Sequence, residues 1–232
     1  MRRRPIPFHS LLRLAVLMLV ALAVQSCAFS YSAKPIHASV IDAETKAPLP
    51  GVIVVAHWVV NFGLEGGSGT DLVLMETVTD AEGQFSFPAW GPVALPSDLP
   101  IEARMKEQSP ELILVREGYQ LRVLNNDLPV SQQASGGLGV RKSDWNGQTI
   151  PLKPFRGSPA SYGVMLSGVL TGITYRDCRF RHVPKLMSHL MKIEKELRDA
   201  HTPNYALPTL RDLENTHGTQ CGSIAQFFEA QQ

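Results

Sequence analysis

The apolar segment 52–60 restricts the fold more than any other part of the sequence. Six of its nine residues are β-branched, and both alternating faces are apolar apart from His57. β-Branched residues favour strands, and a strand that is apolar on both faces is buried from both sides. We therefore expect a strand that is buried on one side and covered over much of the other. His57 is expected to be a hydrogen-bonded core or edge histidine rather than a catalytic base.

Six further short segments carry strand signals and are separated by turn residues. They are 36–41, 72–79, 84–87, 112–115, 120–124 and 148–152. Between them we expect a glycine-rich loop at 61–71, a hairpin turn at 80–83 with Gly83 at positive φ, and a proline-broken loop at 89–110. Phe85 and Phe87 alternate onto one face and are expected in the core. Seven short strands with frequent turns predict a mainly β fold, a seven-stranded Ig-like or transthyretin-like β-sandwich.

The C-terminal part of the sequence, 157–232, changes to helical patterns. Leu186, Leu190, Ile193 and Leu197 recur at helical spacing, with charged residues on the opposite face. Shorter helices are expected after Pro208 and over 224–228. The small, apolar segment 163–173 is too short to span a bilayer, so we expect it to pack against the sandwich. The sequence therefore predicts an α-helical C-terminal extension.

The N-terminus has the three parts of an export signal. Arg2, Arg3 and Arg4 precede an apolar segment of about 11 residues, which ends before Ser26 and Cys27. The sequence Val-Gln-Ser-Cys at 24–27 resembles the bacterial lipobox. This resemblance implies a lipoprotein signal peptide at 1–26, an acylated Cys27 and a lipidated tether at 27–34. Ala28 after the cysteine implies sorting to the outer membrane. An ordinary secretory signal with an incidental cysteine is the alternative.

Charge and cysteine content restrict the partners. The formal charge of the whole chain is +1, and removing the four arginines before Cys27 lowers it to −3. A mildly acidic protein lacks the basic patch that nucleic acids require. Cys178 and Cys221 remain as a pair in an oxidising compartment, and we predict that they form a disulfide.

Two motifs within 36–87 resemble a known family, the carboxypeptidase regulatory-like domain, which is a transthyretin-like sandwich. The first is D-x-x-T-x-x-P-L-x-G and the second is T-D-x-x-G-x-F; the Arg-Glu-Gly-Tyr at 116–119 is similar to a late Gly-Tyr in that family. The matching residues are Asp42, Thr45, Pro48, Leu49 and Gly51, then Thr79, Asp80, Gly83 and Phe85. The resemblance implies such a sandwich over 35–156. It also implies a non-catalytic accessory that stabilises or positions enzymes, binds glycans or forms part of a cell-surface assembly.

Motifs for catalysis and metal binding are absent from the sequence. There is no G-x-S-x-G, S-x-x-K or H-E-x-x-H, and the glycine-rich segment 63–69 lacks the lysine of a P-loop. We therefore predict no catalytic residue, no metal and no cofactor. The expected function is a lipid-anchored accessory module of the outer membrane that faces the periplasm or the cell surface and binds a protein or a glycan.

The alternative is a metal-dependent hydrolase with a site between the sandwich and the C-terminal helices. His182 and His189 lie two helical turns apart and are its candidate ligands. A polar cleft that joins these histidines to a carboxylate would favour the hydrolase. An apolar seam between sandwich and helices would favour the binding module.

Overall fold

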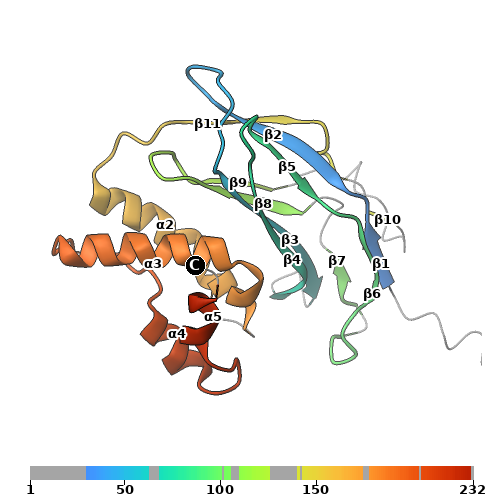
Figure 1. Ribbon diagram of the computed structural model, residues 1–232. Coiled ribbons are helices and arrows are strands. Elements are labelled where there is room, and N and C mark those ends of the chain that lie inside the picture. Colours follow the sequence, from blue (N-terminus) through green and yellow to red (C-terminus); the bar gives the residue numbers. More distant parts are fainter. Residues whose placement is uncertain are drawn as a thin grey trace, which may run out of the picture.

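The computed structural model describes residues 30–62, 68–100, 102–105, 110–125, 140–141, 143–174, 178–203 and 205–230. The predicted signal peptide and Cys27 lie outside the described residues. The described part is mainly β, with helices in its C-terminal third (Figure 1). Among the described helices, none is both long and apolar enough to cross a membrane.

The first layer consists of two short sheets that continue one another. Strands β1 (Ser30–Ala33), β6 (Trp90–Ala94) and β10 (Val140–Arg141) form one sheet in the order β10-β1-β6. Strands β2 (Ile36–Asp42), β5 (Gln84–Phe87) and β11 (Thr149–Leu152) form the other in the order β11-β2-β5. Because β1 leads into β2 and β5 into β6 after short breaks, the two sheets follow the same path (Figure 1).

The second layer is built around the apolar strand β3 (Ile53–Phe62). It pairs antiparallel with β4 (Ser68–Val78) on one side and with β8 (Glu111–Val115) on the other, and β9 (Arg122–Leu124) follows β8. The short β7 (Arg104–Met105) also pairs with β3. Val54 and Trp58 of β3 share one buried cluster with Phe85 and Phe87 of the first layer. The two layers therefore form a β-sandwich-like core. Phe85 is 5% exposed, which confirms its predicted burial.

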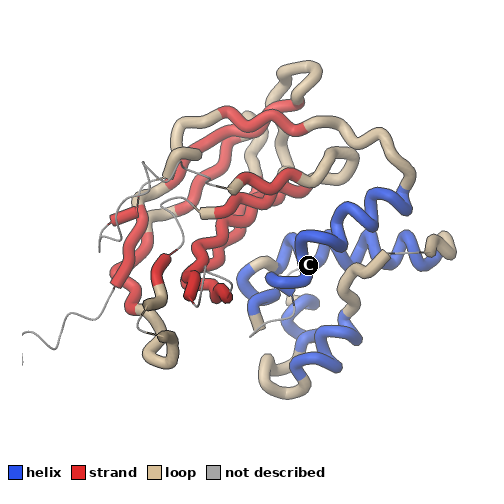
Figure 2. Tube along the Cα trace, turned by 180° about the vertical axis from the view of Figure 1, so that it is seen from behind, coloured by secondary structure: helices blue, strands red, loops and turns tan. Residues whose placement is uncertain are grey.

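Helices cover the other face of β3. They are α2 (Pro159–Thr174), the 3₁₀ helix η2 (Arg179–His182), α3 (Pro184–Asp199), α4 (Leu210–His217) and α5 (Ile224–Glu229), and they gather on one side of the strands (Figure 2). Val55 of β3 and Ile113 of β8 are buried with Leu186 and Leu190 of α3. Burial from both sides explains why β3 is apolar on both faces.

The disulfide between Cys178 and Cys221 is present, as predicted. The two Cα atoms lie 5.5 Å apart and the residues are separated by 43 positions. The bond joins the start of η2 to the turn between α4 and α5. It therefore joins the segment between α2 and η2 to the segment between α4 and α5.

The two family-like motifs interlock in space. Asp42 accepts hydrogen bonds from the backbone N–H groups of Glu44 and Thr45, at 2.7 and 2.8 Å, and from the Tyr119 hydroxyl at 2.8 Å. These hydrogen bonds lower the pKa of Asp42 to about 2, and the bond from the Thr45 backbone N–H has the largest effect. The Thr79 hydroxyl accepts from Val52 N–H at 2.8 Å and donates to the Leu49 carbonyl at 2.6 Å. Thr79 of the second motif thus supports the turn formed by the first motif, and Tyr119 supports the same turn through Asp42.

Several expectations about strands and loops were wrong. The described residues contain eleven strands, not seven. Strand β1 occupies part of the expected tether, and β6 and β7 lie in the expected loop 89–110. The loop expected at 61–71 is shorter, because β3 continues to Phe62 and β4 begins at Ser68.

The turn at 80–83 does not close a hairpin. Strand β5 pairs with β2, whereas β4 pairs with β3, so the turn carries the chain from one layer to the other. Gly83 does have a positive φ of 71°, as expected. An ideal Cβ there would lie 2.5 Å from the Val40 carbonyl oxygen, so this close approach also requires glycine.

Candidate functional site

A polar cluster lies between the second sheet and the helical layer. His57 of β3 contacts the Asp71 carboxylate of β4, and Arg179 of η2 forms an ion pair with the same carboxylate. Nδ1 of His57 lies 3.6 Å from Glu111 of β8, and Arg179 also donates to the Thr70 hydroxyl at 3.0 Å. The side chains of Asp71 and Arg179 are each 10% exposed. The predicted hydrogen-bonded histidine is therefore confirmed.

His57 is cationic in this cluster at neutral pH. Desolvation by burial favours the neutral imidazole, but the hydrogen bonds and the charges of Asp71 and Glu111 outweigh it. The net effect raises the pKa of His57 to about 9. Two cations and two carboxylates thus neutralise one another and fasten η2 to the sheet. Because the imidazole is protonated and shared between two carboxylates, the cluster holds β3, β4, β8 and η2 together by charge pairing.

The two histidines of the hydrolase alternative are not brought together. His182 is exposed at the end of η2, whereas His189 of α3 is half-buried, and burial lowers its pKa. Within the described ranges, no three His, Cys, Asp or Glu residues are grouped to hold a metal ion.

The seam between the sandwich and the helices is largely apolar. Besides the His57 cluster, it contains the carboxylate of Glu76, which accepts hydrogen bonds from the backbone N–H groups of Lys185 and Leu186 at 2.9 and 2.7 Å. These are unpaired donors of the first turn of α3, so Glu76 caps that helix from a neighbouring strand. Burial raises the pKa of Glu76, although the two hydrogen bonds oppose this.

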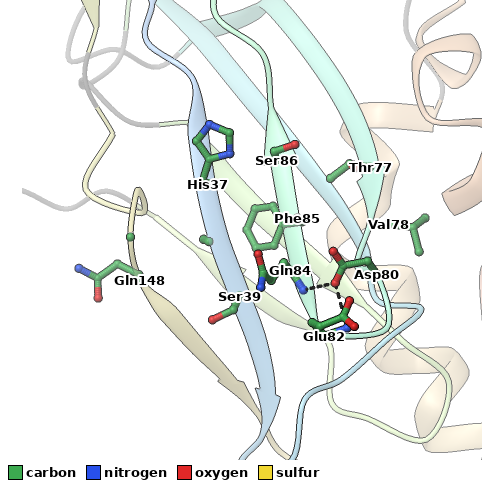
Figure 3. A pocket seen from close by; sticks show the side chains of 12 residues that line it. His37, Ser39, Thr77, Val78, Asp80, Glu82, Gln84, Phe85, Ser86 and Gln148 are labelled. Atoms are coloured by element: carbon green, nitrogen blue, oxygen red, sulfur yellow. Dashed lines mark hydrogen bonds between the residues drawn. The ribbon is translucent and has the colours of Figure 1, made fainter.

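The candidate binding site is a polar groove over the β11-β2-β5 sheet. It has a volume of about 590 Å³ and extends from exposed residues of β2 and β5 to Thr77 and Val78 of β4. Figure 3 shows side chains of β2 and β5 and of the turn after β4 around it. The residues that line this polar groove are His37, Ala38, Ser39, Thr77, Val78, Asp80, Glu82, Gln84, Phe85, Ser86, Gly147 and Gln148.

Strand alternation positions the polar side chains of the groove. In β5, Phe85 and Phe87 point into the core, so Gln84 and Ser86 are exposed on the opposite face. In β2, His37 is exposed and Ser39 is half-exposed by the same alternation. These side chains stand on paired strands and are therefore held at fixed spacing.

Hydrogen bonds within the turn fix one wall of the groove. Asp80 accepts from the backbone N–H groups of Glu82 and Gln84, at 3.1 and 2.7 Å (Figure 3). The opposite wall is tied by the backbone N–H of His37, which donates to Asn146 at 2.9 Å. The polar groove is thus preformed on rigid backbone. The groove was not among the sites predicted from the sequence, although polar residues alternate with apolar ones in 37–39 and 84–86.

Comparison with known proteins gives no family. No family model and no curated protein matches the chain. Among solved structures, a pilus 2b backbone protein of group B streptococcus is 19% identical over 53% of this chain and 41% of its own length, with a TM-score of 0.23. A 3-chlorocatechol 1,2-dioxygenase of Rhodococcus opacus 1CP is 15% identical over 56% of this chain and 62% of its own, with a TM-score of 0.30.

A third structure is an alternative pilotin of the type II secretion system of Vibrio cholerae. It is 16% identical over 53% of this chain and 98% of its own, with a TM-score of 0.27. The chain spans less than two thirds of the pilus protein and of the dioxygenase. These similarities are too weak to support an argument about fold or function.

Proposed function

We propose that this chain is a non-enzymatic, lipid-anchored binding module of the bacterial cell envelope, and that its polar groove binds a glycan. The observation that carries the proposal is the lining of the groove. Hydroxyl, amide, imidazole and carboxylate groups from three strands and two turns line one surface. A ligand rich in hydroxyl groups can both donate to and accept from such a surface.

The charges of the groove favour a glycan over other polymers. Asp80 and Glu82 stand at one wall, and the described residues that line the groove include no lysine or arginine. A phosphate backbone would be repelled by these carboxylates. The sparse apolar surface offers little to an apolar ligand, because such ligands require apolar pockets.

Export and lipid anchoring are supported by two features. The export signal ends in a lipobox-like sequence before Cys27, and the disulfide is typical of an oxidising compartment. The described chain begins three residues after Cys27, at β1. Strand β1 would lie near the membrane in an anchored molecule. The polar groove is on the β11-β2-β5 sheet, which follows β1 along the chain, so the groove would lie farther from the membrane than β1. Placement on the outer membrane, facing the periplasm or the cell surface, is part of the proposal.

A transthyretin-like sandwich of the carboxypeptidase regulatory-like type is the fold we propose for 35–156. The interlocked motifs around Asp42 and Thr79 support it.

Co-sedimentation with purified peptidoglycan sacculi tests the glycan proposal. The Gln84→Ala/Ser86→Ala double variant removes two exposed side chains of the groove, and we expect about tenfold weaker binding from two lost hydrogen bonds. Gln120→Ala is the matched control, because Gln120 is also an exposed glutamine but lies outside the groove. Failure of the wild-type protein to sediment, or equal sedimentation of the double variant, would refute a glycan site at this groove.

Labelling with palmitate tests the anchor separately. The wild-type protein should incorporate the label, and Cys27→Ala should abolish incorporation and leave the precursor uncut. Persistent labelling of the Cys27→Ala variant would contradict the lipid-anchor proposal.

A further inference from the structure

Strand β4 leaves a long sheet edge unpaired. It extends over eleven residues and pairs with β3 on one side, and no other described strand pairs with its outer side. The strands at the other ends of the described sheet orders are shorter: β6 has five residues, β5 and β11 have four each, β9 has three and β10 has two. Short edges are one way in which proteins avoid pairing with other chains. Strand β4, with eleven residues, is not protected in this way.

A trough runs along this open edge. Six consecutive residues of β4, 70–75, line the trough. Successive side chains of a strand point to opposite faces, so a cavity that contacts consecutive residues lies along the edge of the strand. Pro96, Asp98 and Leu99 form one wall, and Arg179 and His182 of η2 form the other. We call this cavity of about 600 Å³ the β4 trough.

The chemistry of the β4 trough suits another strand. Leu72, Val73, Leu74 and Met75 are only half-buried. An edge strand also presents a row of backbone N–H and C=O groups, which pair with an added strand. The sequence of β4 contains neither proline nor lysine, the residues that commonly protect such edges, and its pairing with β3 is irregular at a single point, beside Leu72.

The charges of the trough are unequal. Arg179 is engaged with Asp71 inside the polar cluster. Asp98 is exposed on the rim, and no ion pair to it occurs within the described ranges. A basic residue on an incoming segment would therefore find a carboxylate at this wall.

We propose that the β4 trough binds an extended segment of a partner polypeptide by strand addition. Backbone hydrogen bonds to the β4 edge would supply affinity, and alternate apolar side chains would contact the trough. The segment would be about six residues long, because the trough follows six residues of β4, and a lysine or arginine would lie beside Asp98. This site shares no residue with the polar groove, so it stands independently of the glycan proposal.

Selection from a random twelve-residue peptide library, with the purified protein as bait, tests the proposal. We expect the selected peptides to alternate apolar and polar residues and to carry a basic residue near one end. Hydrogen exchange should show that a selected peptide slows exchange at the backbone amides of 70–75, because pairing closes that edge.

Two variants and one matched control sharpen the test. Leu72→Lys places a charge on the edge and should abolish binding of the selected peptide. Asp98→Lys, at an exposed position, should weaken it about fivefold, the usual limit for a surface ion pair. Val164→Lys introduces the same charge at a 50% exposed valine of α2 outside the trough and should bind like wild type. A library that yields no binder would overturn the proposal, as would binders that protect another segment or retain full affinity for Leu72→Lys and Asp98→Lys.

Discussion

Replacing Gly83 by alanine should destabilise the protein far more than the same change at Gly51. Both glycines have positive φ, 71° and 74°, and an alanine in this region costs about 1–2 kcal/mol. No atom lies within 4 Å of a Cβ placed on Gly51, so its cost should end there. A Cβ on Gly83 would lie 2.5 Å from the Val40 oxygen and 2.9 Å from the Leu49 nitrogen.

Those two backbone atoms cannot yield without loss of hydrogen bonds. The Val40 N–H donates to the Gly83 oxygen at 2.7 Å, and the Leu49 N–H donates to the Val40 oxygen at 3.0 Å. Each weakened bond costs about 1 kcal/mol, and more if a buried group is left unpaired. We therefore expect a total of about 3–5 kcal/mol for Gly83→Ala against about 1–2 kcal/mol for Gly51→Ala.

Urea denaturation of the two purified variants and the wild-type protein measures this difference in the free energy of unfolding. Equal losses for the two variants would refute the reasoning, because the close approach of Gly83 to the neighbouring turn would then have no energetic effect. A larger loss at Gly51 would contradict it more strongly.

Two further perturbations follow from the helical layer and the polar cluster. Replacing Cys178 and Cys221 by serine opens a loop of 43 positions and should lower the free energy of unfolding by ~4 kcal/mol in the chain-entropy model, which urea denaturation would measure; an unchanged midpoint would contradict this. The pKa of His57 is raised from 6.5 to about 9, so its stabilisation should be complete below pH 6.5 and be lost as the pH rises through 9. The loss should be on the order of 3 kcal/mol in the wild-type protein and much smaller in Asp71→Asn, and identical pH profiles of the two proteins would count against the cluster.

The elements that could be predicted from the sequence are those whose residue pattern lies within one segment. Both faces of segment 52–60 are apolar, which predicted its burial from both sides. Helix α3 has apolar residues at helical spacing, which predicted a helix packed on one face. The disulfide followed from cysteine number and expected compartment. In each case, the prediction needed only the residues of one segment or the number of cysteines.

The missed elements depend on partners that are distant in the sequence. Strand β6 contains Gly91 and Pro92, which locally indicate a loop, and it forms because β1 lies beside it. Asp71 stood at the end of a glycine-rich segment, and its role requires Arg179 from the helical layer. The polar groove and the β4 trough are likewise assembled from separate strands, so their position depends on the order of strands in the sheets.

Glycan binding at the polar groove, and not a reaction at the seam between sandwich and helices, is the function proposed for this protein. Chemical-shift mapping by NMR, with soluble glycan fragments released from peptidoglycan as the probe, tests it most directly. We expect shifts at His37, Ser39, Gln84, Ser86 and Gln148, with the residues around His189 unchanged. Shifts centred on His182 and His189, or no shifts at saturating fragment, would contradict it.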